Sequence, residues 1–189
     1  MRIVETKVYT FNELSDEVKA KVIEKNLYLN VDHEWWENVY EDAENVGLKI
    51  TGFDIGRGQD CTGAFTTYAK KVAESILKEH GEQCDTWKTA SDYMQEYTKV
   101  IANECQEEAD EICVAFNLQE GFCDVNHDYY YDPDTEDIDA EFLRSLLEDY
   151  RIMLQKEYEY LTSEEAIIEC IAANEYEFTE KGEMIRDTY

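Results

Sequence analysis

Hydrophobic positions recur at helical spacing along most of the chain, and this pattern predicts several amphipathic helices. The first helix is expected from about residue 16 to 29, with Leu14, Val18 and Val22 on its apolar face. A second is expected after Asp32 and ends at Gly47, because glycine readily takes the left-handed conformation that closes a helix. A third is predicted between residues 68 and 79.

Two longer helical patterns lie in the C-terminal half. One covers residues 85–117, as one helix or two, and the other covers residues 138–160. The buried stripe of the second is expected to consist of Phe142, Leu146, Leu147, Tyr150, Met153 and Leu154. Thr162 is followed three residues later by Glu165, a spacing typical of a capping box, so a further helix is predicted to start there.

Alternating and β-branched segments predict strands at residues 2–9, 48–55 and 61–67. Glycines at 56 and 58 place a turn between the last two strands, and residues 176–185 could form a terminal hairpin. The pattern therefore predicts an α+β fold, mainly helical, with a small antiparallel sheet of three or four strands. We expect a single domain over 1–189, with an α/β lobe at 1–84 and a mainly helical lobe at 85–189.

The composition is that of a folded protein rather than a disordered acidic tail. Hydrophobic residues make up 43% of the chain and aromatic residues 13%, which is enough apolar surface for a core. No apolar run approaches the roughly 18 residues that span a bilayer, and no secretion signal is visible at the start. The six cysteines form no C-x-x-C pair, so we expect reduced thiols and a cytoplasmic location in a bacterial host cell.

Net charge is the sequence property that most limits the possible functions of this chain. The chain has 45 acidic residues against 17 basic ones, for a net charge of −28. A protein so acidic should repel nucleic acid and anionic membranes, and it should attract proteins that bind nucleic acid. We therefore expect a basic nucleic-acid-binding protein as the partner, and the sequence leaves a homodimer open.

The acidic excess is concentrated in one part of the chain. Residues 101–150 hold 16 acids and a single base, Arg144, for a net charge of −15. Solvated surfaces usually mix both signs, so this clustering favours a binding surface, although a merely solvated loop and helix is about as good an explanation. We name the predicted surface the acidic docking surface; it comprises Glu104, Glu107, Glu108, Glu111, Asp124, Asp128, Tyr129, Tyr130, Tyr131, Asp132, Asp134, Glu136, Asp137 and Asp139, with the tyrosines as anchors.

One segment of this surface begins like a calcium-binding loop. Asp124, Asn126 and Asp128 have the right spacing, but Tyr129 stands where the loop needs glycine and Thr135 where it needs a bidentate glutamate. Acidic loops more often bind only counterions, so no specific metal site is expected. A thermal melt with and without calcium tests the alternative of a calcium-binding protein.

The sequence contains no recognisable catalytic motif. His33, His80 and His127 are the only histidines, and no local signature ties any of them to a nucleophile. The short run Gly56-Arg57-Gly58 lacks the rest of a phosphate-binding loop. We therefore expect neither an enzyme nor a cofactor.

Blocks at both ends resemble those of small acidic proteins encoded by phages and mobile elements. The first is residues 9–17 with Trp35-Trp36 and residues 40–43, and the second is residues 157–166 with residues 173–179. Some proteins similar to these are anti-CRISPR inhibitors of Cas9-type nucleases, and others are labelled antitoxins. The resemblance names no catalytic residue and is thin between residues 70 and 130.

Together these observations favour an inhibitor of a nucleic-acid-binding bacterial defence protein, chiefly an anti-CRISPR that blocks a Cas nuclease. Cas9-type effectors hold guide and target in a strongly positive channel, whose Lys and Arg side chains can pair with carboxylates. An antitoxin that neutralises a partner toxin is the main alternative, and the neighbouring reading frame would distinguish the two.

Overall fold

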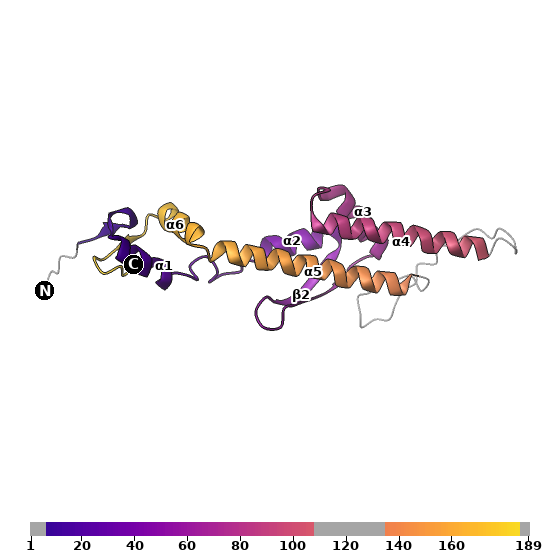
Figure 1. Ribbon diagram of the computed structural model, residues 1–189, viewed down its shortest axis with the longest axis horizontal. Coiled ribbons are helices and arrows are strands. Elements are labelled where there is room, and N and C mark those ends of the chain that lie inside the picture. Colours follow the sequence, from indigo (N-terminus) through magenta and orange to yellow (C-terminus); the bar gives the residue numbers. More distant parts are fainter. Residues whose placement is uncertain (1–6, 108–134, 186–189) are drawn as a thin grey trace. The chain divides into compact units, whose positions relative to one another are not determined.

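The computed structural model describes residues 7–107 and 135–185, and of residues 102–107 only the backbone (Figure 1). It confirms the α+β class, with helices predominating over two antiparallel strand pairs. The chain divides into two compact units. We call Trp36–Gln155 the hairpin unit, and Met1–Trp35 with Lys156–Tyr189 the terminal unit. This division differs from the predicted lobes at 1–84 and 85–189, because the two ends of the chain pack with each other.

In its described residues, 36–107 and 135–155, the hairpin unit contains a two-stranded hairpin and four helices. Its elements are α2 (Glu37–Val46), β2 (Leu48–Asp54), β3 (Asp60–Phe65), α3 (Ala69–Glu79), α4 (Asp85–Glu107) and the larger part of α5 (Glu136–Leu161). The sequence pattern predicted each of these elements, with α2 beginning a few residues later than expected. Of the long helical pattern at 85–117, residues after 107 lie outside the described part.

The hairpin presents one apolar face to the helices. Leu48 pairs with Phe65 across the strands, and the register shifts between Ile50 and Gly52. Leu48, Ile50 and Phe65 are buried, whereas Lys49 and Thr51 between them are exposed. This alternation is what a sheet covered on one side requires.

Helices α4 and α5 lie side by side and antiparallel in the hairpin unit (Figure 1). The hydroxyl of Thr89 in α4 donates a hydrogen bond to Asp149 of α5. One turn further along α4, the Tyr93 hydroxyl donates a hydrogen bond to Asp139 near the start of α5. The predicted stripe of α5 is confirmed, since Phe142, Leu146, Leu147, Tyr150 and Leu154 are buried and Met153 packs against the same core.

Two glycines let the backbone approach its neighbours closely. Gly47 ends α2 with φ +92°, as the sequence predicted, and a Cβ there would lie 3.1 Å from the Thr67 methyl. A Cβ on Gly63 of β3 would lie 2.6 Å from the Lys49 carbonyl oxygen and 3.0 Å from a Leu147 methyl of α5. The hairpin can therefore pack this closely on α5 only because residue 63 has no side chain.

The terminal unit joins segments from the two ends of the chain. It contains β1 (Tyr9–Thr10), the 3-10 helix η1 (Phe11–Glu13), α1 (Asp16–Lys25), α6 (Glu164–Ala173) and β4 (Glu177–Phe178). Its core consists of Leu14, Val22, Ile167, Ile171 and Phe178. Val18 and Ile23 pack against this core, which confirms the predicted apolar face of α1.

The prediction of one sheet that includes residues 2–9 is wrong. Of the described residues of that segment, 7–9, only Tyr9 lies in a strand, β1, and this strand pairs with β4 rather than with the hairpin. Strand propensity is a local property, whereas the choice of partner depends on residues far away in the sequence. The predicted terminal hairpin is present in a short form, with a bridge between Phe178 and Met184.

The start of α6 also differs by one residue from the prediction. Ser163, not Thr162, is the N-cap, and its hydroxyl oxygen accepts a hydrogen bond from the backbone N–H of Ala166. The Thr162 hydroxyl instead donates to the Tyr158 carbonyl at 2.8 Å, in the last turn of α5. Both residue types can cap a helix, so sequence alone did not distinguish two adjacent candidates.

Candidate functional site

The described part of the acidic docking surface lies at the end of α4 and the start of α5. Glu104 and Glu107 belong to the last turns of α4, and Glu136 and Asp137 are exposed in the first turn of α5. The antiparallel arrangement of the two helices brings these turns to the same end of the pair (Figure 1). The remaining predicted residues lie outside the described part of the chain, namely Glu108, Glu111, Asp124, Asp128, Tyr129, Tyr130, Tyr131, Asp132 and Asp134.

Asp139 does not belong to an exposed surface. It is 7% exposed, and its two carboxylate oxygens accept hydrogen bonds from the hydroxyls of Tyr93, at 2.7 Å, and Thr135, at 3.2 Å. Its carboxylate therefore joins the start of α5 to α4 from within. Charge counting could not separate this residue from its neighbours, because burial depends on which face of the helix a residue occupies.

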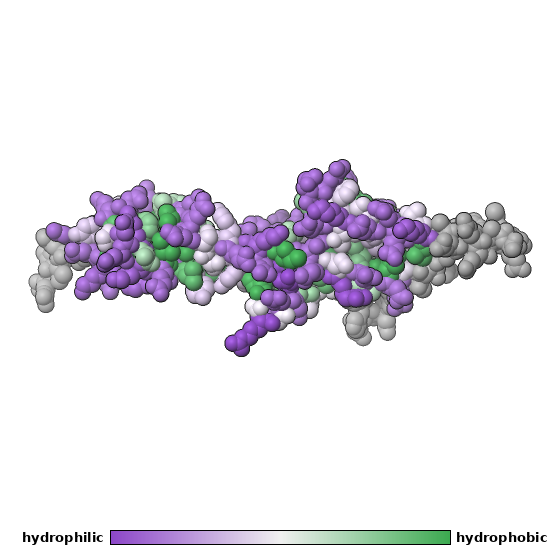
Figure 2. Space-filling view, viewed as in Figure 1, coloured by the Kyte–Doolittle hydropathy of each residue, from purple (hydrophilic) through white to green (hydrophobic). Residues whose placement is uncertain are grey.

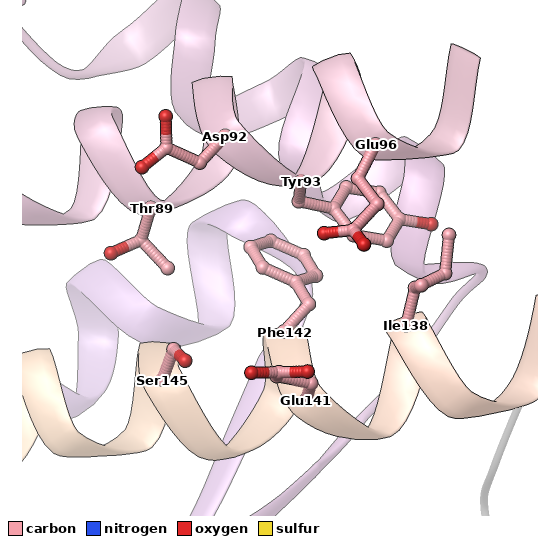
Figure 3. Close-up of a pocket in the computed structure, with 8 residues that line it drawn as sticks. All are labelled: Thr89, Asp92, Tyr93, Glu96, Ile138, Glu141, Phe142 and Ser145. Carbon is pink, nitrogen blue, oxygen red and sulfur yellow. The ribbon is translucent and has the colours of Figure 1, made fainter. Parts of the chain in front are cut away.

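Further along the same helix pair there is a groove of about 170 Å³ with an acidic rim (Figure 3). We call it the α4–α5 groove; it is lined by Thr89, Asp92, Tyr93, Glu96, Ile138, Glu141, Phe142 and Ser145. Phe142 extends from α5 between the helices, and its ring stacks on Tyr93 with centroids 4.3 Å apart. The floor of the groove is thus a rigid aromatic pair.

Three carboxylates around this groove are exposed and unpaired. Asp92 and Glu96 come from α4 and Glu141 comes from α5, and none of them forms an ion pair within the described residues. Asp92 and Glu96 were absent from the predicted set, although their four-residue spacing places them on one helix face. Glu141 was counted in the acidic segment but was not assigned to the site.

Glu148 and Asp149, further along α5, have hydrogen-bond partners within the protein. Glu148 forms two hydrogen bonds of 2.7 Å with the guanidinium of Arg151, which lowers the pKa of that carboxyl. Asp149 accepts a hydrogen bond from Thr89, but burial raises its pKa. The unpaired negative charge is therefore concentrated in the first turns of α5 and the facing part of α4.

A second polar cluster lies at the meeting point of four helices, and we call it the Asp42 cluster. The Asp42 carboxylate of α2 accepts a hydrogen bond of 2.9 Å from the Tyr150 hydroxyl and lies 3.6 Å from Nε2 of His80. His80 Nδ1 and the Thr86 hydroxyl share a hydrogen bond of 2.8 Å. Sequence analysis missed this cluster, because its members come from separate helices and form no local motif.

The electrostatics of the Asp42 cluster fit a structural role. The His80 imidazole, and to a lesser extent the Tyr150 hydroxyl, holds the pKa of Asp42 below its ordinary value, although partial burial acts in the opposite direction. Burial and the nearby Asp42 charge raise the pKa of Tyr150. Thr86 is only 3% exposed, so its hydroxyl, although bonded to an imidazole, is closed to any substrate. The cluster fixes the helices and offers no open nucleophile.

Cysteine and metal chemistry are limited in the described part of the chain. Cys61, Cys84 and Cys170 are free thiols, and burial raises the pKa of Cys61 to about 11, so that it is protonated at neutral pH. Residues 7–107 and 135–185 contain no group of three or more His, Cys, Asp or Glu side chains placed to hold a metal ion. Most of the calcium-like loop lies outside these ranges.

None of the helices in the described ranges combines the length and the apolar character that crossing a bilayer requires. Comparisons of the chain with protein families, with curated proteins and with solved structures found no match. The site must therefore be interpreted from its own geometry.

Proposed function

We propose that this protein inhibits a nucleic-acid-binding bacterial defence protein by covering its basic nucleic-acid surface. The observation that supports this proposal is the set of exposed carboxylates of Asp92, Glu96 and Glu141 at the α4–α5 groove, which form no ion pair with any other described residue. Together with Glu136 and Asp137, they form the described part of a surface that can pair with lysine and arginine side chains. The resemblance at the two ends of the chain suggests a Cas nuclease as the target.

The helices hold these carboxylates in a fixed arrangement. Next to the groove, the Tyr93–Phe142 stack and the Tyr93–Asp139 hydrogen bond lock α4 onto α5. A preorganised charged surface loses less entropy on binding than a mobile one. Figure 2 shows hydrophilic residues covering most of the described surface on the face in view, so recognition by charge fits this protein better than burial of a large apolar patch.

The affinity of such a surface for its partner depends on the number of ion pairs that the two proteins form. An exposed ion pair contributes roughly 0.2–1 kcal/mol, so a few pairs alone give weak binding. A dense acidic surface also steers the encounter and rejects partners of like charge. Binding by this mechanism should be fast and should weaken as salt is added.

The test compares two variants with the same change in net charge. The first carries Asp92→Lys, Glu96→Lys and Glu141→Lys at the groove, and the second carries Glu24→Lys, Glu74→Lys and Glu180→Lys at exposed positions elsewhere. Each full-length protein is used to capture partners from a bacterial host lysate at low and high salt, and cleavage by the captured nuclease is then measured.

The groove variant should lose capture and inhibition, while the control variant should keep both. Equal loss in the two variants would show that net charge, rather than this surface, is responsible. Full capture and inhibition by the groove variant would contradict the proposal. Capture of a toxin encoded beside this protein, in place of a nuclease, would favour the antitoxin alternative.

A further inference from the structure

A second surface of the hairpin unit, formed by α2 and β2, combines aromatic rings with unpaired acids. Trp36 stands directly before α2, Tyr40 lies one turn further on, and both contact Phe53 of β2. The ring centroids of Trp36 and Phe53 are 5.8 Å apart, and those of Tyr40 and Phe53 are 6.2 Å apart, both edge to face. All three side chains are only partly buried, so the rings form part of the molecular surface.

The charged residues of α2, which carries Tyr40, all have one sign. From Trp36 to Val46 the chain has four acids, Glu37, Glu41, Asp42 and Glu44, and no lysine or arginine. Glu37 and Glu41 are exposed, follow Trp36 and Tyr40 directly, and form no ion pair within the described residues. Asp42 belongs to the internal cluster instead.

The Glu37–Glu41 pair is not explained by the stability of α2. Glu37 and Glu41 are like charges one turn apart, which is slightly destabilising. Departures from local rules of this kind tend to occur where a surface has another function.

We propose that this surface, which we call the α2–β2 face, binds an arginine-bearing segment of a basic protein partner. A guanidinium group can stack on an aromatic ring while its N–H groups donate to an adjacent carboxylate, and the α2–β2 face presents both groups side by side. Lysine lacks the planar stacking surface, so the face should prefer arginine.

Other occupants fit this face less well. A second copy of the chain would place carboxylates against carboxylates, and nucleic acid or an anionic membrane would be repelled by the same charges. The proposal goes beyond the α4–α5 groove and does not depend on it, because the residues are different and belong to other elements.

The probes are two fluorescent peptides of equal length and charge, one of alternating arginine and glycine and one of alternating lysine and glycine. Binding to the full-length protein is measured by anisotropy at low salt. We expect the arginine peptide to bind about two- to fivefold more tightly than the lysine peptide, as stacking on an exposed ring predicts. Equal affinities would overturn the proposal.

Two variants test whether the arginine peptide binds at the α2–β2 face. Glu37→Gln with Glu41→Gln should weaken arginine-peptide binding by about fivefold, since two exposed ion pairs are lost, whereas Glu24→Gln with Glu74→Gln should leave it within twofold. Trp36→Leu should remove the preference for arginine over lysine. Because Trp36→Leu could also perturb α2, the glutamine pair, which keeps the side-chain shape, is the decisive variant.

The groove variant with lysines at 92, 96 and 141 separates this proposal from the proposed function. It should bind both peptides more weakly and still prefer arginine. Loss of the preference in that variant would place the arginine site at the α4–α5 groove and overturn the proposal for the α2–β2 face. A concentration-dependent dimer that is lost in Glu37→Gln with Glu41→Gln would also overturn it, because the occupant would then be a second copy.

Discussion

Asp42 and Glu141 are both helix carboxylates of the hairpin unit, but their surroundings differ. Asp42 lies among His80 and Tyr150 in a cluster that fixes four helices, whereas Glu141 is exposed at the rim of the α4–α5 groove without an ion pair in the described residues. The same chemical group therefore occurs in two environments. Partnered acids maintain the fold, and acids without an ion pair among the described residues remain accessible at the surface.

Among substitutions in the Asp42 cluster and at the α4–α5 groove, those at Tyr150 should change the free energy of unfolding most. Tyr150 is completely buried, and its hydroxyl donates a hydrogen bond to Asp42. Tyr150→Ala removes the ring and leaves a cavity, so the free energy of unfolding should fall by about 4 kcal/mol, measured by urea denaturation. Tyr150→Phe keeps the ring and should cost only about 1 kcal/mol. If both variants lost the same amount, the hydroxyl rather than packing would be the dominant contribution.

Removal of the Asp42 carboxylate should have the next largest effect. Asp42→Ala leaves the Tyr150 hydroxyl without its acceptor and removes the carboxylate that lies 3.6 Å from the buried Nε2 of His80, and we expect a loss of about 1–2 kcal/mol. Glu141→Ala is the matched control at the groove and should change stability by less than about 0.5 kcal/mol. A similar loss in both would remove the distinction between partnered and available acids.

The stabilising role of the ionised Asp42 carboxylate should also appear, as a smaller effect, in the pH dependence of stability. The folded-state pKa of Asp42 lies below its ordinary value of 3.8, so the ionised carboxylate stabilises the fold above that pH. This stabilisation disappears as the pH falls through the lowered pKa. The wild-type protein should thus lose more stability than Asp42→Asn between pH 5 and the acid limit, measured by thermal melts. Parallel curves for the two proteins would contradict the role of Asp42.

Substitution of Asp149 should change stability least, and the pH dependence of its contribution should be opposite in sign to that of Asp42. Burial raises the pKa of Asp149, so its ionised form is unfavourable in the folded state, and its contribution to stability increases as the pH falls. Asp149→Asn keeps an acceptor for the Thr89 hydroxyl and removes the charge. We expect stability at pH 7 to stay constant or rise by a few tenths of a kcal/mol, measured by denaturant titration. A loss above about 1 kcal/mol would mean that the charge itself is needed.

Periodicity was enough to predict the local elements. The stripe from Phe142 to Leu154 identified the buried face of α5, and Gly47 marked the end of α2, because both signals are contained in a few consecutive residues. The pairing of β1 with β4 could not be predicted in this way, since Tyr9 and Phe178 carry no local information about each other.

The candidate site likewise depends on tertiary contacts that local sequence patterns do not predict. Counting charge located the acidic segment but could not show that Asp139 is buried under Tyr93, or that Asp92 and Glu96 face α5. The Asp42 cluster was out of reach for a similar reason, because its members come from four separate helices. What the sequence lacked in each case was the tertiary arrangement, not the identity of the chemical groups.

The pairing of Tyr9 with Phe178 also sets an order of events during synthesis. The hairpin unit, Trp36–Gln155, is continuous in sequence, so a growing chain can complete it before the C-terminal segment exists. The terminal unit needs α6 and β4, which are translated after the whole of the hairpin unit. Until then, Leu14 and Val22 lack the partners that cover them in the finished core, Ile167, Ile171 and Phe178. During that interval the segment that carries Leu14 and Val22 is open to proteases and chaperones.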